Sequence, residues 1–276
     1  MDQKIVTPTE RRRKVISLSD SWEYALRVAA ILFFPFIFTW IFLDMPQNQG
    51  VIELSGAITV EAPAGVKRTT VLPDGSKVML NARSTITYTV DSNTHKRETR
   101  LMGEAFFEVT KDSLYPFSVH SGGLTTTALG TSFNINYRPD RLVTEVSLVT
   151  GSVQVTTKDK TGGVKVTKLQ PGERLIYDTR EFSFQIDNFD TLETLAWKEG
   201  ILYFKKAGIE QVVQKLEDWY GVEVSLEGNL NRVNAQQWTY TGMFKNQSLE
   251  HVLTGISYVK GFHFEINDKN ITLMFN

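Results

Sequence analysis

Two acidic side chains are the best candidates for chemistry in this sequence. Glu104 follows a glycine and precedes the segment Ala-Phe-Phe, so we expect a buried carboxylate that accepts hydrogen bonds from backbone amides, rather than a general acid. Asp74 lies between a proline and a glycine, where an aspartate side chain commonly stabilises a turn. Both residues are therefore expected to support the fold and not to catalyse a reaction.

Metal, thiol and phosphate chemistry also lack the residues they need. The chain contains no cysteine, which excludes disulfides, thiol catalysis and cysteine-ligated metals. Four histidines have no spacing that would form a metal pair on a helix: His95, His120, His251 and His263. No P-loop, nucleophile elbow, zinc-protease motif or dinucleotide fingerprint is present, and the glycine pairs at 122–123 and 162–163 are typical of hairpins. We expect no enzyme activity, no cofactor, no metal and no small-molecule substrate.

Aromatic residues near the C-terminus could instead contact a partner. Trp219, Tyr220, Trp238 and Tyr240 could form a carbohydrate platform, but core and interface packing explains them more simply. Of these, Trp219, Tyr220 and Tyr240 are our candidates for partner contact. The chain has 276 residues and a formal net charge of −1, which offers no broad positive field for nucleic acid.

An uncharged apolar run occupies residues 28–43. With the residues from Tyr24 onward it reaches the ~20 residues that a helix needs to cross a membrane. A buried core helix would normally carry a polar face, and no small-residue cleavage site follows to suggest a removed signal peptide. We therefore favour an uncleaved transmembrane helix over these two alternatives.

Flanking charges predict how this helix is oriented. Six Lys or Arg residues precede the run, and none follows it until Lys67. Because positive flanks stay in the cytoplasm, residues 1–27 are expected to be a short cytoplasmic tail. The bulk of the chain is then expected in the periplasm, anchored in the inner membrane.

Beyond the predicted helix the periodicity changes twice. Residues 44–58 carry proline, glycine and polar residues and read as a tether, whereas residues 59–187 alternate with period two, as in half-buried strands. This predicts an all-β domain, either a sandwich, a barrel or a solenoid-like stack. The alternating sets are Ile86, Tyr88 and Val90; Ala105, Phe107 and Val109; Phe133, Ile135 and Tyr137; Val153 and Val155; and Val164 and Val166.

The C-terminal residues 200–276 have a mixed pattern, after a linker at 188–199. Apolar residues at helical spacing precede Gly221 and Gly261, and each glycine is placed to end a helix. Ser248 is placed to cap the second helix. Strand-like segments flank both helices, and the segments Phe262–Ile266 and Ile271–Phe275 are expected to close as a hairpin. This predicts a small α/β domain of βαβ–βαβ order, with two helices on one face of one sheet.

Several motifs of the β-rich part resemble FecR-type domains. They include Leu-Pro-Asp-Gly-Ser at 72–76, Gly-Glu-Ala-Phe-Phe at 103–107 and Leu-Gly-Thr-Ser-Phe at 129–133. The matching residues, expected to be structural, are Pro73, Asp74, Gly75, Asn81, Gly103, Glu104, Phe107, Pro116, Phe117, Gly130, Thr131, Phe133, Gly151, Pro171 and Gly172. The part after residue 200 is similar to the domain that follows FecR in Bacteroidetes-type regulators. That domain is in turn similar to the short N-terminal modules of secretins and TonB-dependent receptors.

The resemblance implies a transmembrane anti-sigma factor. Such a regulator relays the state of an outer-membrane TonB-dependent transporter, through the transporter's signalling domain, to an extracytoplasmic-function sigma factor. Its partners would be those two proteins and the membrane. A membrane-anchored periplasmic binding or scaffold protein without a sigma partner is the alternative, because it would have the same exterior.

The short tail departs from the family pattern, which usually includes a folded cytoplasmic sigma-binding domain of several helices. Twenty-seven residues cannot bury a core of their own. Either the start is truncated, or the tail binds a sigma factor through a short helix, or that role is lost. Val15, Leu18 and Trp22 lie at helical spacing and could dock in a partner's groove, although an interfacial extension of the membrane helix would show the same pattern.

Overall fold

The computed structural model describes residues 57–90, 96–140, 142–229 and 238–276, which form mostly strands and few helices. No helix in these ranges combines the length and the apolar character that crossing a membrane requires. The predicted tail 1–27, the predicted span 28–43 and the tether up to residue 56 lie outside the described residues.

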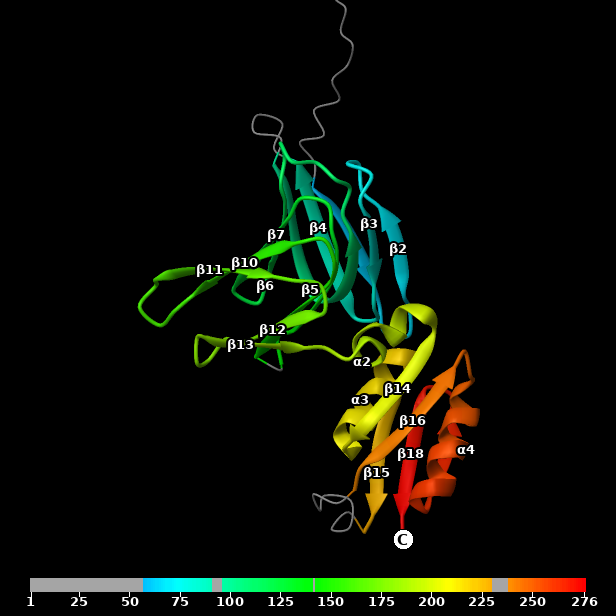
Figure 1. Cartoon of the computed structure of the whole chain (residues 1–276). Coiled ribbons are helices and arrows are strands. Elements are labelled where there is room, and N and C mark those ends of the chain that lie inside the picture. The colour runs from blue at the N-terminus through cyan, green and yellow to red at the C-terminus, as the bar shows by residue number, and fades with distance from the viewer. Residues whose placement is uncertain (1–56, 91–95, 141, 230–237) are drawn as a thin grey trace, which may run out of the picture. The chain divides into compact units, whose positions relative to one another are not determined.

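Residues 58–188, here called the sandwich region, form two antiparallel-rich layers (Figure 1). One layer has the strand order β1-β4-β5-β6-β7-β10-β11 and the other has the order β2-β3-β5-β8-β9-β12-β13. The strands are β1 (Ile58–Ala62), β2 (Arg68–Val71), β3 (Lys77–Leu80), β4 (Ser84–Val90), β5 (Arg97–Glu108), β6 (Phe117–Ser121), β7 (Leu124–Ala128), β8 (Ser132–Arg138), β9 (Val143–Thr150), β10 (Val153–Lys158), β11 (Val164–Leu169), β12 (Glu173–Asp178) and β13 (Ser183–Asn188).

Strand β5 belongs to both layers. Its first half pairs with β4 as far as Met102, and its second half pairs with β8 from Gly103 onward. Gly103 has φ +95°, a conformation that favours glycine, and a Cβ there would lie 2.7 Å from the Cα of Ser84. The backbone can therefore change layers only because this position has no side chain.

The core between the layers is aromatic and aliphatic. Phe107 stacks on Phe133 with ring centroids 5.0 Å apart, and Phe117 stacks on Tyr88 at 6.1 Å. All four rings are 1% exposed or less. The predicted alternation is confirmed in β10 and at Ile86 and Tyr88 of β4, whereas in β5 and β8 the intervening residues Phe106 and Asn134 are buried as well. It fails in β11, where Val164 and Val166 are 66% and 58% exposed, because this edge strand turns them to the outer surface.

The segment expected as a linker is ordered and partly buried. It contains α2 (Thr191–Leu195), capped by the Asp190 side chain, and a 3-10 helix, η1 (Ala196–Glu199). Leu195 and Trp197 pack with Phe106 of β5 in a small apolar cluster. The chain therefore leaves the sandwich region through a packed turn.

Residues 201–275, here called the C-terminal region, follow the predicted order of strands and helices, including the closing hairpin. The elements are β14 (Ile201–Ala207), α3 (Ile209–Tyr220), β15 (Glu223–Gly228), β16 (Tyr240–Lys245), α4 (Leu249–Lys260), β17 (Phe262–Asn267) and β18 (Asn270–Phe275). Both helices end as predicted at left-handed glycines, Gly221 (φ +69°) and Gly261 (φ +68°), and Ser248 caps α4 by accepting from the His251 amide.

The expectation of one sheet is wrong. β14 pairs only with β16, while β15, β18 and β17 form a separate three-stranded sheet. The reason is that each βα half gives a strand to both sheets, so the halves interlock. One apolar core joins the sheets to both helices, with Phe204, Leu216, Leu253 and Leu273 fully buried.

Candidate functional site at the junction of the two regions

Asp218 in the last turn of α3 ties the C-terminal region to the sandwich region. Its carboxylate lies 3.0 Å from Nε of Arg83 and 2.8 Å from a guanidinium nitrogen of Arg138. Its backbone oxygen accepts a hydrogen bond from the Gly65 amide at 2.9 Å. The Asp218 side chain is only 13% exposed, so this charge depends on its two arginine partners.

An aromatic contact lies beside this ion pair. Trp219 packs against the cluster that contains Phe106 and Trp197, and the Lys67 ammonium lies 3.2 Å from the centroid of the Trp219 ring. Burial lowers the pKa of Lys67 to about 8. The end of α3 therefore contacts the sandwich region through a charge, a backbone hydrogen bond and an indole ring.

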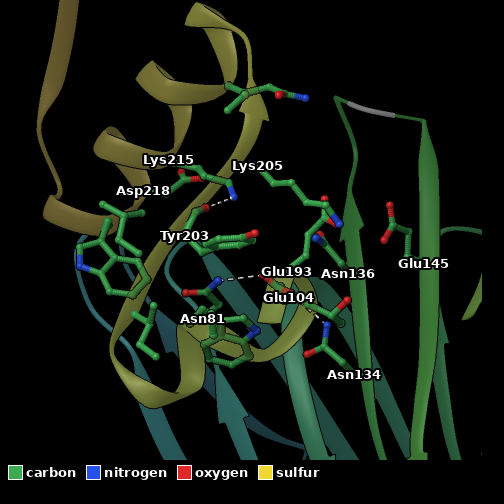
Figure 2. A pocket seen from close by; sticks show the side chains of 18 of the residues that line it. Asn81, Glu104, Asn134, Asn136, Glu145, Glu193, Tyr203, Lys205, Lys215 and Asp218 are labelled. Carbon is green, nitrogen blue, oxygen red and sulfur yellow. Dashed lines mark hydrogen bonds and ion pairs between the residues drawn. The ribbon is translucent and has the colours of Figure 1, made fainter. Parts of the chain in front are cut away.

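A polar cavity of about 290 Å³ lies between the two regions (Figure 2). Its walls come from β5, β8, β9 and β12 on one side and from α2, η1, β14 and α3 on the other. The charged side chains that line it are Glu104, Arg138, Glu145, Arg174, Glu193, Lys205, Lys215 and Asp218. Four are basic and four are acidic, so the lining carries no formal excess of either sign.

Glu104 lies in the wall of this cavity and is 8% exposed. Its two carboxylate oxygens accept hydrogen bonds from the side-chain amides of Asn81 (2.8 Å) and Asn134 (2.9 Å), as the dashed lines in Figure 2 show. Burial raises the pKa of Glu104 above its usual range, although both hydrogen bonds oppose the shift. The buried carboxylate was predicted, but its partners are side-chain amides and not the expected backbone amides. The two carboxamides come from β8 and from the loop after β3.

The other charges around the cavity have partners within the chain. Arg174 contacts Glu145 at 3.2 Å and Asp187 at 3.0 Å. Lys205 contacts Glu193 at 3.2 Å and also the Asp190 cap of α2. These pairs neutralise one another locally, within the sandwich region for Arg174 and between β14 and α2 for Lys205.

Within the described ranges, no three His, Asp or Glu side chains are grouped closely enough to hold a metal ion. The Lys215 ammonium donates to the backbone oxygen of Tyr203 at 2.6 Å. This positive charge is therefore engaged within the chain instead of facing a ligand. What the site can do is transmit movement, since a shift of Asp218 must break or drag its contacts with Arg83 and Arg138.

Asp74 has the predicted turn role and one further partner. Its carboxylate accepts from the amide and the hydroxyl of Ser76, and it pairs with Arg97 at 2.9 Å. Arg97 is 5% exposed and also donates to the backbone oxygens of Tyr115 and Thr110. The turn between β2 and β3 is therefore fixed to the start of β5 by a buried ion pair.

The other FecR-type residues lie in turns or in the core. Gly130 and Gly151 have positive φ, and a Cβ on Gly130 would lie 2.8 Å from the Cα of Lys111. The Gly172 amide donates to the Leu148 oxygen, and the Thr131 oxygen accepts from Val109. Turn or core positions are also found for Pro73, Gly75, Gly103, Phe107, Phe117, Phe133 and Pro171. Asn81 lies half-buried in the loop after β3, and Pro116 is exposed immediately before β6.

The C-terminal candidates for partner contact make contacts within the chain. Tyr240 is 6% exposed and belongs to the C-terminal core, so it offers no surface to a partner. Trp219 packs within the chain at the junction. Tyr220 donates its hydroxyl to the Gln247 oxygen, and burial raises its pKa to about 12. The N-terminal candidates, Val15, Leu18 and Trp22, lie outside the described residues.

Sequence reasoning missed the residues that matter most at the junction, which are Asp218, Arg83 and Arg138. One signal was available. An acidic side chain in the last turn of a helix is disfavoured by the helix dipole, so Asp218 at the end of α3 indicated a cationic partner. The sequence could not identify which arginines supply it, because both come from distant strands.

Comparisons with known proteins agree with this architecture. The family profile described as "FecR protein" matches residues 58–154, and the profile described as "FecR, C-terminal" matches residues 201–273. No curated protein matches the chain.

Two solved structures resemble the chain over most of its length. Both come from Parabacteroides distasonis ATCC 8503, and each is described as a candidate anti-sigma factor. One is 28% identical with a TM-score of 0.67, and the match covers 80% of this chain and 100% of the other. The second is 29% identical with a TM-score of 0.65, and the match covers 78% of this chain and 98% of the other. With two FecR profiles matched in order and a shared fold, the chain belongs to the FecR family.

Proposed function

We propose that this chain is an anti-sigma regulator that relays the state of an outer-membrane TonB-dependent transporter to an extracytoplasmic-function sigma factor. The observation that carries the proposal is the ordered match of both FecR profiles, together with the likeness to two candidate anti-sigma factors. The role is regulatory, not catalytic.

In this proposal the apolar run 28–43 spans the inner membrane and the tail 1–27 contacts the sigma factor. Residues 57–276 then face the periplasm. The six positive charges before the run and the absence of any between the run and Lys67 support this orientation. A single helix transmits little by tilting, so a change in association or a regulated cleavage carries the signal across the membrane.

The C-terminal region receives the transporter's signalling domain, and the junction passes the event to the sandwich region. Support comes from Asp218, which bonds to both Arg83 and Arg138 from the other region. Binding that displaced α3 would have to break these contacts or move the strands that carry them. The junction is therefore the part of the described structure where the two regions are coupled.

A transcription reporter tests the anti-sigma role. The reporter is driven by a promoter of the candidate extracytoplasmic-function sigma factor, in cells with and without the full-length protein. Loss of the chain should change reporter output severalfold, and Asp218→Ala should produce full-length protein that no longer responds to the transporter's inducer. If reporter output is the same with and without the chain, the anti-sigma role is wrong. That result would favour the alternative of a membrane-anchored scaffold protein without a sigma partner.

A fusion tests the topology separately. Alkaline phosphatase joined to Asn276 should be active, because that enzyme folds only outside the cytoplasm. A fusion that is inactive, while a cytoplasmic reporter at the same position works, would overturn the proposed orientation. It would leave the reporter experiment unaffected.

A further inference from the structure

One end of the sandwich region carries exposed apolar side chains from three separate segments. Val71, the last residue of β2, is 66% exposed, and Leu114, in the loop before β6, is 81% exposed. Leu129, in the loop after β7, is 45% exposed. Single exposed apolar residues need no explanation, so what matters is whether these three lie together.

The buried Arg97 joins the first two segments. Its guanidinium pairs with Asp74 at 2.9 Å, in the turn that follows Val71. It also donates at 2.8 Å to the backbone oxygen of Tyr115, the residue after Leu114. Val71 and Leu114 therefore belong to the same end of the fold, and one buried charge holds both segments there.

The loop that carries Leu114 is also bound to the third segment, and its shape is fixed. The Asp112 amide donates to the backbone oxygen of Leu129 at 3.0 Å. The Asp112 carboxylate accepts from the amides of Leu114 at 2.9 Å and Tyr115 at 3.1 Å. Because an aspartate turn of this kind holds the backbone, Leu114 is presented to the outside by an ordered loop.

Two exposed lysines lie at this end. Lys96 immediately precedes Arg97, and Lys111 lies beside Gly130, where an added Cβ would be 2.8 Å from the Lys111 Cα. Neither lysine forms an ion pair with a carboxylate of the described ranges. The entry surface, as we call it here, consists of Val71, Lys96, Lys111, Leu114 and Leu129.

The nearby carboxylates already have partners. Asp74 pairs with Arg97, and Glu108 lies 3.7 Å from the Lys77 ammonium. The Asp112 carboxylate is directed to the two amides of its own loop. The two lysines of the entry surface are therefore available to an anion outside the chain.

The chain enters the sandwich region at this same end. β1 begins at Ile58 beside the last residues of β4, and Val90 at the end of β4 lies opposite Arg97. Residues 44–57 connect Ile58 to the apolar run 28–43, and even fully extended they reach at most about 50 Å. A span at 28–43 would therefore keep this end of the fold close to the membrane.

The other end of β1 leads to the C-terminal region. After β1 the chain reaches Gly65, whose amide donates to the backbone oxygen of Asp218 in α3. The entry surface and the junction therefore lie at opposite ends of β1. A contact made by the entry surface would leave the C-terminal region open to another protein.

We propose that the entry surface rests on the periplasmic surface of the inner membrane, with Leu114 among the upper acyl chains and the two lysines at anionic headgroups. The inference rests on the proposed function, from which it takes the membrane span. A lipid surface is the occupant because the short connection holds this end near the bilayer, where even a weak attraction acts at high effective concentration. Apolar side chains flanked by lysines also match the chemistry of an anionic bilayer interface.

Fluorescence quenching in proteoliposomes tests the contact with the full-length chain. The sequence has no cysteine, so Ser113→Cys places one label beside Leu114 while that leucine stays in place. The vesicles contain phosphatidylcholine and phosphatidylglycerol, and part of the phosphatidylcholine carries a nitroxide quencher in its acyl chain. Quenching should be at least about threefold stronger than for a label at Tyr258→Cys, which is 91% exposed on α4.

Variants in the Ser113→Cys background separate a specific contact from mere proximity. Leu114→Asp should reduce quenching to the level of the α4 label, because a carboxylate is repelled by the headgroups and does not enter the acyl region. Tyr258→Asp, a matched change on α4, should leave quenching unchanged. Lys96→Gln combined with Lys111→Gln should lower quenching at least about twofold, and vesicles of phosphatidylcholine alone should have the same effect.

Two results would overturn the contact. One is a label at residue 113 that is quenched no more than the label at residue 258, and the other is quenching that Leu114→Asp leaves unchanged. Flotation of the vesicles after an alkaline carbonate wash distinguishes this failure from failure of the proposed function. A chain that the wash extracts lacks the span, which overturns both proposals, whereas a retained chain without quenching overturns the contact alone.

Discussion

The sandwich region and the C-terminal region each join two sheets around one core, but they do so in different ways. In the sandwich region the layers share β5, which crosses between them at Gly103. In the C-terminal region the two sheets share no strand and are held by side-chain packing with α3 and α4. The first solution depends on one backbone conformation and the second on many apolar contacts.

This difference teaches where each region is vulnerable. A single atom added at the layer crossing must disturb both layers at once, whereas the C-terminal region should lose stability gradually as contacts are removed. Asp218 is a third case, because it belongs to neither core and still links the two regions.

The largest effect is expected at the crossing itself. Gly103→Ala should destabilise the chain by at least about 3 kcal/mol, since it adds a collision with Ser84 to the cost of a positive φ. Gly172→Ala is the matched control, with φ +92° and no atom within 4 Å of the new Cβ, and should cost about 1–2 kcal/mol. Urea unfolding measures both, and equal losses would show that the crossing is not specially constrained.

The next largest effect is expected at the junction. Asp218→Ala should lower the free energy of unfolding by about 2–4 kcal/mol, because the largely buried Arg138 then has lost its carboxylate partner. Calorimetry should then show two separate transitions, one for each region. Glu181→Ala removes an exposed ion pair with Lys160 and should change stability by less than about 0.5 kcal/mol. A single unshifted transition for Asp218→Ala would argue against coupling through this residue.

Smaller effects are expected at the helix caps of the C-terminal region. Ser248→Ala should cost about 1 kcal/mol, since it removes the acceptor for the His251 amide. Gly208, at the same position before α3, has open space around its Cβ, so Gly208→Ser should stabilise by a few tenths of a kcal/mol. Opposite signs for the two variants in thermal unfolding would show that a side-chain acceptor at this position stabilises both helices.

The smallest change in stability at any one pH is expected for a substitution of Glu104. Its effect is seen in how steeply stability varies with pH. Its pKa is raised in the folded chain from an ordinary value of 4.5, so the folded state binds the proton more tightly than the unfolded state. The stabilisation is complete below about pH 4.5 and is lost as the pH rises towards the folded pKa.

Glu104→Gln should flatten this part of the stability profile, measured as urea midpoints between pH 4 and pH 8. Glu181→Gln, on the surface, should leave the profile as it is. A profile that stays equally steep in Glu104→Gln would show that another group causes the slope.

Local patterns in the sequence predicted much of the secondary structure. Alternating apolar residues identified most strands, Gly221 and Gly261 identified the helix ends, and the Pro-Asp-Gly turn was placed correctly with its aspartate bond. These features depend on residues close together in the chain, so their physical causes can be read locally. The exposed valines of β11 were misread because alternation does not reveal whether a strand lies at an edge.

The sequence by itself determined the β-rich class, the element types and the absence of cysteine chemistry. Only the tertiary structure decided that β5 serves two layers, that the βα halves exchange strands between two sheets, and that Asp218 meets Arg83 and Arg138. Glu104 shows the same limit, since its burial could be predicted while its partners, Asn81 and Asn134, could not. The physical reason is that strand pairing and side-chain partners join residues far apart in the chain, which no local periodicity records.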